Sequence, residues 1–469
     1  MRGELTQESV LRALRLPIAD PLMEAFAIVL LVPLFLSVAI WNGFPIIYYD
    51  TGAYILQGLG RHFVVERSPV YSLFLSYGGG SRSLWLIAII QAVLTAFVIV
   101  ETARCVAPKM GIAAFAGVAV ALVVLTGLPW YAGQIEPDCF TALTVLCTYL
   151  LAFHSRDLGI PRTIAIFLTT GFAAATHPSH ILLIVGLVLI VAIFKIISIA
   201  RHGAAGLQLS SLALPLMSAA LAAIMTFAAN YSLTGKIFFN RAGGVFVFAS
   251  MLQDGLVDRL LDDTCPQSAY RLCAYKGELP KTAERWLWFP GSPFVALGHF
   301  AGTAAESQRI VDDILVRYPG AFLRSTINDT AEQLLDFRTG DQIEPQEWAI
   351  HSNLAKFIPT QMASYMHARQ QEGKIRFHYV NDVHWPVAAL AQIGTVAAFL
   401  MMVRRRRWNS AIFLGFTMAA LLGNALICGA LSNPHDRYQS RLVWLPVFAL
   451  ALLGTEGRFS LRDHAESVT

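Results

Sequence analysis

The stretch IIYYDTGAYILQGLGRHFVVERSPVYSLFL, residues 46–75, follows the first long apolar run of the chain and ends in a new apolar segment. It places one acid, Asp50, inside an aromatic and glycine-containing turn. The sequence Arg67–Ser68–Pro69 then restarts a helical pattern, since proline suits the first turn of a helix. The apolar runs around this insert determine the fold, and its polar groups need an explanation.

The composition is that of a membrane protein. Hydrophobic residues make up 55% of the 469 residues and charged residues only 14%, with a mean hydropathy of +0.55. A soluble domain has roughly 25% charged residues. The net charge of +4 is small and dispersed, so nucleic acid is not an expected partner.

The apolar runs predict an all-α polytopic membrane protein with about ten transmembrane helices. A helix needs about 20 largely apolar residues to cross a bilayer. Runs that reach or approach this length lie near 24–42, 84–103, 111–128, 139–153, 163–176, 181–200, 208–230, 386–403, 410–431 and 442–455.

The basic residues predict the orientation, because Lys and Arg concentrate in short cytoplasmic loops. With ten spans, both termini and the basic loops fall on the cytoplasmic side. The residues concerned are Arg2, Arg12, Arg15, Arg104, Lys109, Arg156, Arg162, Arg201, Arg404 to Arg407 and Arg458.

Three regions follow from this topology. Residues 1–230 form a transmembrane module of about seven helices, with a first exterior loop at 43–83. Residues 231–385 form a mixed, mainly helical exterior segment between helices 7 and 8, and residues 386–469 form about three further helices and a cytoplasmic tail. Cys265 and Cys273 lie in the exterior segment, where we expect a disulfide because oxidation is favoured there.

Asp50 has two explanations of near-equal weight. An acid packed among Tyr49 and Tyr54 at a membrane surface is partly desolvated and could take a proton from an acceptor hydroxyl or amine. Alternatively, Asp50 caps the helix that begins at Thr51.

Glu136 and Asp138, in QIEPDCF, precede the fourth predicted span on the same side as Asp50. With Asp50 they could complete a divalent-cation site, since hard cations take oxygen ligands. They could equally favour a helix N-terminus electrostatically, with Pro137 in its first turn.

The segment NPHDRYQSR, residues 433–441, introduces the last span. Arg437 and Arg441 are four residues apart and share a face if the helix has begun. Arginine suits bidentate phosphate recognition, whereas an interfacial anchor including Tyr438 is the alternative. His177, in the turn THPSH, is a candidate for a substrate hydrogen bond and not for a zinc site.

The order of these features resembles the GT-C class of integral-membrane glycosyltransferases, particularly the bacterial relatives of protein O-mannosyltransferases and of the lipid A aminoarabinose transferase. YYDTGAY matches the acid of that family's first exterior loop, and ERSPVYSLFL matches its Arg–Pro–Pro–Tyr-like restart with Ser68 in place of the first proline. QIEPD matches a second acidic loop, and DRYQSRLVWLP matches an Arg–Tyr segment before the last helix.

The resemblance implies a sugar donor on polyprenyl phosphate or diphosphate, and an acceptor that is a lipid, a glycan or a protein. Transfer would occur on the periplasmic face of a bacterial inner membrane, with Asp50 as base or positioning group. It leaves a divalent cation (Mg or Mn) open at Glu136 and Asp138. The expected substrate-binding residues are Tyr49, Tyr54, Arg67, Tyr71, His177, Asn240, Arg241, Arg437, Tyr438 and Arg441.

A transporter or flippase of a lipid-linked substrate is the alternative function. Its path would place ionisable residues at mid-membrane depth, where Lys195 is the main candidate. A non-catalytic scaffold would explain the exterior segment but not the charged groups gathered on one side.

Overall fold

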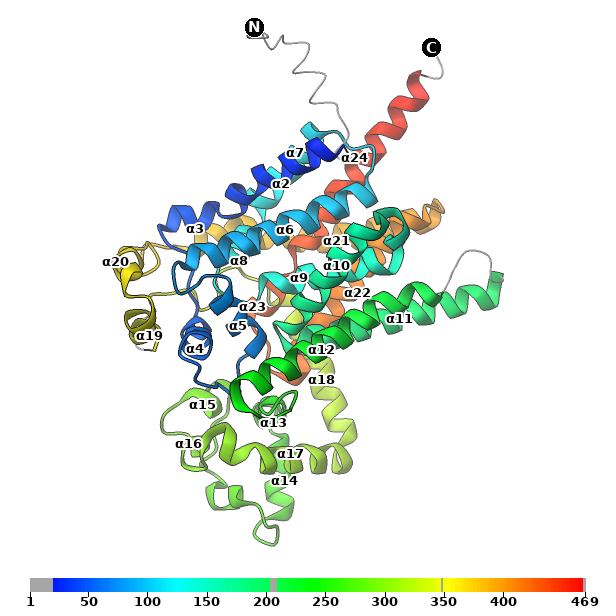
Figure 1. Cartoon of the computed structure of the whole chain (residues 1–469). Helices are drawn as coiled ribbons and strands as arrows, with labels where there is room; N and C mark the ends of the chain where they lie inside the picture. The colour runs from blue at the N-terminus through cyan, green and yellow to red at the C-terminus, as the bar shows by residue number, and fades with distance from the viewer. Residues whose placement is uncertain (1–19, 203–208, 347–348, 467–469) are drawn as a thin grey trace.

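The computed structural model describes residues 20–202, 209–346 and 349–466. Within these residues the chain is all-α, as the sequence predicted, and contains no strand. One isolated bridge joins Ile46 to Gln134 and ties the first exterior loop to the loop before the central helix. Figure 1 shows long helices packed side by side, with a cluster of shorter helices at one end.

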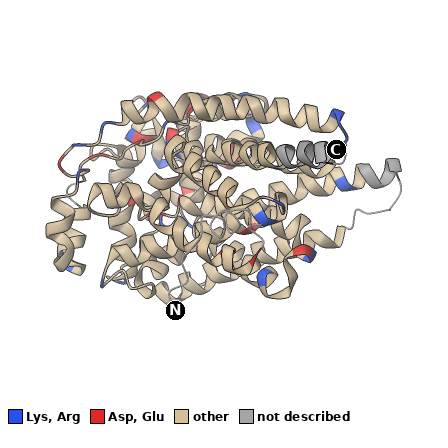
Figure 2. Ribbon diagram, turned by 90° about the horizontal axis from the view of Figure 1, so that it is seen from above, with Lys and Arg blue, Asp and Glu red and all other residues tan. Residues whose placement is uncertain are grey.

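Seven segments of the described residues are long and apolar enough to cross a membrane, so the chain is an integral multi-pass membrane protein. Figure 2 shows that charged residues are sparse along the long helices. The seven segments are α2 with α3 (Pro21–Phe35 and Ser37–Asn42), α6 (Leu84–Val106), α10 (Ser155–Ala175), α11 (Pro178–His202), η1 with α12 (Leu209–Leu212 and Ala213–Thr234), α21 (Phe377–Arg404) and α22 (Trp408–Leu431).

The three other expected spans correspond to helices that are not among these seven segments. Helices α7 (Ile112–Leu125) and α9 (Cys139–Phe153) are apolar but short, and α24 (Trp444–Glu466) follows the last exterior loop. Residues Cys139 to Ala152 of α9 are all buried, so neighbouring helices shield this short central helix from lipid. The total of ten spans and the orientation stay predictions, and Arg2, Arg12 and Arg15 lie outside the described residues.

The exterior segment forms a helical cluster with its own apolar core around Phe248, Trp286 and Phe294. A disulfide joins Cys265 to Cys273 beside this core. Its helices are α13 (Gly243–Gln253), α14 (Leu256–Thr264), η2 (Arg271–Tyr275), α15 (Ala283–Trp288), α16 (Pro293–Ala296), α17 (His299–Arg317) and α18 (Pro319–Leu335). The helices α19 (Ala349–Phe357), η3 (Pro359–Gln361) and α20 (Met362–Met366) lie apart from this cluster, and α19 packs on α4.

Short helices in the loops set the positions of the polar residues. They are α4 (Tyr49–Gly58), α5 (Pro69–Tyr77), α8 (Leu128–Ala132) and α23 (Asp436–Ser440). Ser68 caps α5 by accepting a hydrogen bond from the backbone of Tyr71, with Pro69 at the first helical position. Helix α4 begins at Tyr49 and not at Thr51, so the expectation that Asp50 is an N-cap is wrong. Tyr48 is the N-cap, and its backbone N–H donates to the hydroxyl of Thr51 at 3.0 Å.

Candidate functional site

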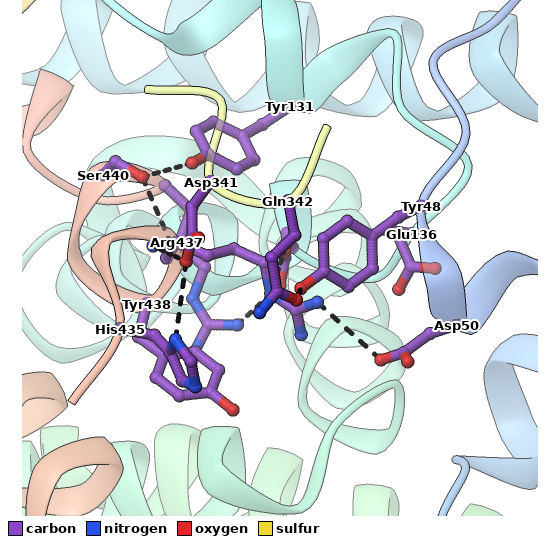
Figure 3. A network of polar contacts seen from close by, with 12 residues as sticks. Tyr48, Asp50, Tyr131, Glu136, Asp341, Gln342, His435, Arg437, Tyr438 and Ser440 are labelled. Carbon is purple, nitrogen blue, oxygen red and sulfur yellow. Dashed lines mark hydrogen bonds and ion pairs between the residues drawn. The ribbon is translucent and has the colours of Figure 1, made fainter. Parts of the chain in front are cut away.

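A cavity of about 690 Å³ lies where the loops meet the exterior ends of the membrane helices. The loop after α4, the start of α11, the end of α12, helix α15 and the segment before α24 all contribute walls. Asp50, Arg67 and Arg437 line the same end of this cavity. In Figure 3 the side chains of Tyr48, Asp50, Glu136 and Arg437 face a common space.

Asp50 lies between two guanidinium groups. Its Oδ1 accepts a hydrogen bond from Nη2 of Arg67 at 2.5 Å, and its Oδ2 lies 3.7 Å from Nη1 of Arg437. All three side chains are largely buried, and Nε of Arg67 has no hydrogen-bond partner among the described residues. The site therefore holds a carboxylate between two cations.

Contacts from three segments hold Arg437 in place. Its Nε lies 3.2 Å from Oδ2 of Asp138, and its guanidinium carbon lies 4.1 Å from the ring centroid of Tyr48. Its backbone N–H donates to Asp341 at 3.3 Å, and the hydroxyl of Tyr48 donates to Gln342. A planar guanidinium satisfies ion pairing and ring stacking at once, which lysine could not do.

Asp138 forms a second ion-paired layer behind the cavity. Its Oδ1 accepts from Nη1 of Arg441 at 2.6 Å, and both residues are buried. Although burial alone would raise it, Arg437 and Arg441 hold the pKa of Asp138 below its usual value. Arg441 does not line the cavity, and Asp138 takes up its guanidinium. Its contact with a substrate stays a prediction.

The surroundings of Glu136 differ from those of Asp50 and Asp138. Its side chain is 1% exposed, Oε1 accepts from the hydroxyl of Thr51 at 3.2 Å, and Oε2 has no partner among the described residues. Burial, followed by the charge of Asp50, raises the pKa of Glu136 well above its usual value. The surroundings of Glu136 therefore favour its neutral, protonated form.

The charged residues around Asp50 fall into two sets. Arg67, Arg437 and Arg441 form ion pairs with Asp50 and Asp138. Three further acids line the cavity away from these pairs, namely Glu66, Glu284 and Glu344. The two guanidinium groups beside Asp50 are the groups of the cavity that suit an anion.

The described side chains do not support the cation site expected from Asp50, Glu136 and Asp138. No group of three or more His, Cys, Asp or Glu in the described part of the chain is placed to hold a metal ion. The physical reason lies in the partners of the acids. Both oxygens of Asp138 face guanidinium groups, and those of Asp50 do the same.

Most of the other predicted binding residues line the cavity, and two do not. Tyr71 is fully buried, and its hydroxyl donates to Gln91 at 2.8 Å. The guanidinium of Arg241 stacks on Phe238, 3.9 Å from the ring centroid. Neither lines the cavity, and substrate binding by these two residues stays a prediction. The residues that do line it are Tyr49, Tyr54, Arg67, His177, Asn240, Arg437 and Tyr438.

Residues of the exterior segment that the sequence did not indicate complete the walls. Glu284 and Trp288 of α15 line the cavity, as do Gln342 and Glu344. The Trp288 ring centroid lies 5.7 Å from the guanidinium carbon of Arg67, and Tyr49 donates its hydroxyl hydrogen to Glu344. These residues have no local motif, and only the fold brings them to the site.

One wall of the cavity is apolar and comes mainly from the membrane helices. Ile181 and Leu182 of α11 and Ile427 and Leu431 of α22 line it, together with Phe246 of α13 in the helical cluster. Leu182 is 49% exposed and Leu431 is 37% exposed, so this wall continues onto the outer surface of the helices. The cavity thus joins a charged, polar end to an apolar wall.

Comparisons with protein-family models, with curated proteins and with solved structures return no match.

Proposed function

We propose that this chain is a membrane glycosyltransferase that moves a sugar from a polyprenyl phosphate or diphosphate to an acceptor on the exterior face. The observation that supports it most is the placement of Asp50 between Arg67 and Arg437 in a cavity with an apolar wall. The acceptor is a lipid, a glycan or a protein.

The two ends of the cavity match the two ends of such a donor. The phosphate is an anion, and the guanidinium groups of Arg67 and Arg437 line the cavity beside Asp50. The polyprenyl chain is apolar and would lie against Leu182, Ile427 and Leu431. The sugar would lie between them, beside Asp50.

The phosphate and Asp50 compete for the same guanidinium groups. In the absence of donor, Arg67 and Arg437 pair with the carboxylate of Asp50. A bound phosphate would draw these guanidinium groups away and leave the carboxylate free to contact the acceptor.

In the chemical step, an acceptor hydroxyl or amine attacks the anomeric carbon of the sugar. A bond forms between the acceptor atom and this carbon, and the bond from the carbon to the phosphate oxygen breaks. The phosphate leaves with the electron pair, which Arg67 and Arg437 stabilise, and Asp50 takes the acceptor proton. Stabilising charge that develops in the transition state is often the largest catalytic effect of a site.

The test uses purified protein in nanodiscs with a panel of radiolabelled polyprenyl-phosphate and diphosphate sugars. Glycosyl transfer releases free polyprenyl phosphate or diphosphate and moves the label to another molecule. If the protein instead moves intact lipid between the leaflets of vesicles without cleaving it, the transporter function is correct and the proposal fails.

A further inference from the structure

Helix α18 (Pro319–Leu335) has an outward face with two distinct edges. Leu323, Ile327 and Ala331 are four residues apart, so they form one exposed apolar edge along the helix. Leu335 extends this edge and is 71% exposed.

The adjacent edge of α18 is polar and also exposed. Arg324, Asn328 and Glu332 repeat with the same spacing, one position after each apolar residue. The opposite side faces the protein, where Ser325 donates to Asp254 and, at 3.2 Å, to Asp329. Helix α18 therefore has three sides: a polar edge suited to water, an apolar edge suited to apolar surroundings, and a side that packs against the protein.

Helix α18 packs against the exterior end of α22, a membrane-spanning helix. A Cβ atom at Gly429 would lie 2.7 Å from the carbonyl oxygen of Asp329, so the two backbones are in close contact. The amide of Gln333 exchanges hydrogen bonds of 2.8 and 3.0 Å with the backbone of His435. These contacts fix α18 at the level where α22 leaves the apolar part of the membrane.

Helix α22, against which α18 packs, has exposed apolar residues of its own. These include Leu422 and Leu426, and residues of a spanning helix that face outward meet acyl chains. An amphipathic helix with an apolar edge beside a charged edge is typical of a helix in the membrane interface. A partner protein that covered the whole face would have to bury Arg324 and Glu332 as well, at a cost in desolvation.

We infer that α18 lies in the exterior interface of the bilayer, with Leu323, Ile327 and Ala331 among the lipid acyl chains. The chain continues from α18 into the segment that provides Gln342 and Glu344 to the cavity wall. The bilayer surface therefore helps to set the position of that wall. This inference rests on the membrane spans and not on the proposed chemistry.

The test places one fluorescent label on each edge of the helix. Ile327→Cys and the matched control Asn328→Cys are each labelled with an environment-sensitive fluorophore in the full-length protein. The proteins are reconstituted in phosphatidylcholine nanodiscs with brominated acyl chains, and the unmodified protein measures labelling of its native cysteines. Leu323→Cys with Arg324→Cys repeats the comparison one turn away if either variant folds poorly.

We expect acyl-chain bromine to quench the label at Ile327 about twofold more than the label at Asn328, because only the apolar edge is in the lipid. Equal quenching at both positions would overturn the inference. So would quenching of the Ile327 label by aqueous iodide as strong as that of the Asn328 label. Protection of the Ile327 label from both quenchers would also overturn it, because a protein or a second copy would then cover the edge.

Discussion

Oδ1 of Asp50 lies 2.5 Å from Nη2 of Arg67, and this ion pair connects the start of α4 to the loop before α5. Arg437, from the other end of the chain, lies 3.7 Å from Oδ2 of the same carboxylate. A phosphate bound by these two arginines would therefore lie beside the carboxylate of Asp50.

Replacing Arg437 should lower transfer strongly. Loss of one preorganised donor to a developing negative charge costs about 10²- to 10³-fold in rate. Arg437→Ala is measured in the nanodisc transfer assay beside Arg259→Ala, whose guanidinium stacks on Tyr318 in the exterior cluster. Equal activities in the two variants would remove Arg437 from the site.

Neutralising Asp138 should destabilise the protein more than neutralising most acids. Asp138→Asn leaves the buried guanidinium groups of Arg437 and Arg441 without a counter-ion, and breaking a buried pair costs about 3–5 kcal/mol. Thermal unfolding in detergent measures the effect. Asp157→Asn, at an exposed ion pair with His154, is the control and should change stability by less than about 1 kcal/mol.

Glu136→Gln should leave thermal unfolding close to that of the unchanged protein. Burial favours the neutral form of this carboxyl group, and the amide of glutamine is a neutral group of the same shape. The same unfolding assay checks the expectation. Destabilisation as large as that of Asp138→Asn would contradict a neutral Glu136.

The acid pair Asp254 and Asp329 should make stability depend on pH. Burial, followed by the charge of Asp254, raises the pKa of Asp329 to about 6, and burial raises the pKa of Asp254 as well. Glu332 adds a further negative charge near both acids. The folded protein then binds protons more tightly than the unfolded chain, so stability falls as the pH rises from about 4 to beyond 6.

Asp329→Asn should reduce this fall in the thermal unfolding midpoint, because the amide does not titrate. Asp262→Asn is the matched control, since its side chain is 67% exposed and pairs with Lys276 at the surface. The control should keep the pH slope of the unchanged protein. Identical slopes in all three proteins would show that the acid pair does not control stability.

The features predicted correctly from the sequence are those that depend on neighbouring residues. Apolar length identifies membrane helices because it is a local property, and Ser68 with Pro69 marked the start of α5. Helices α7 and α9 are shorter than a bilayer requires. Neighbouring helices bury α9, and this burial cannot be read from the residues of α9 themselves.

The sequence indicated residues of the candidate site but not which residues they pair with. Asp50, Arg67 and Arg437 carried recognisable local patterns, and the structure brings them together. The pairing of Arg441 with Asp138, however, joins residues 303 positions apart. Because of that contact, Arg441 is a buried partner of Asp138 and does not line the cavity.

The most direct measurement compares donor binding and sugar transfer in Asp50→Asn and in the unchanged protein. Asparagine keeps the shape of the side chain but cannot take the acceptor proton, so we expect transfer to fall about 10²- to 10⁴-fold. Binding of a labelled polyprenyl-phosphate sugar should remain, since Arg67 and Arg437 are intact and released from the carboxylate. Transfer at the unchanged rate would contradict the role of Asp50 as the base.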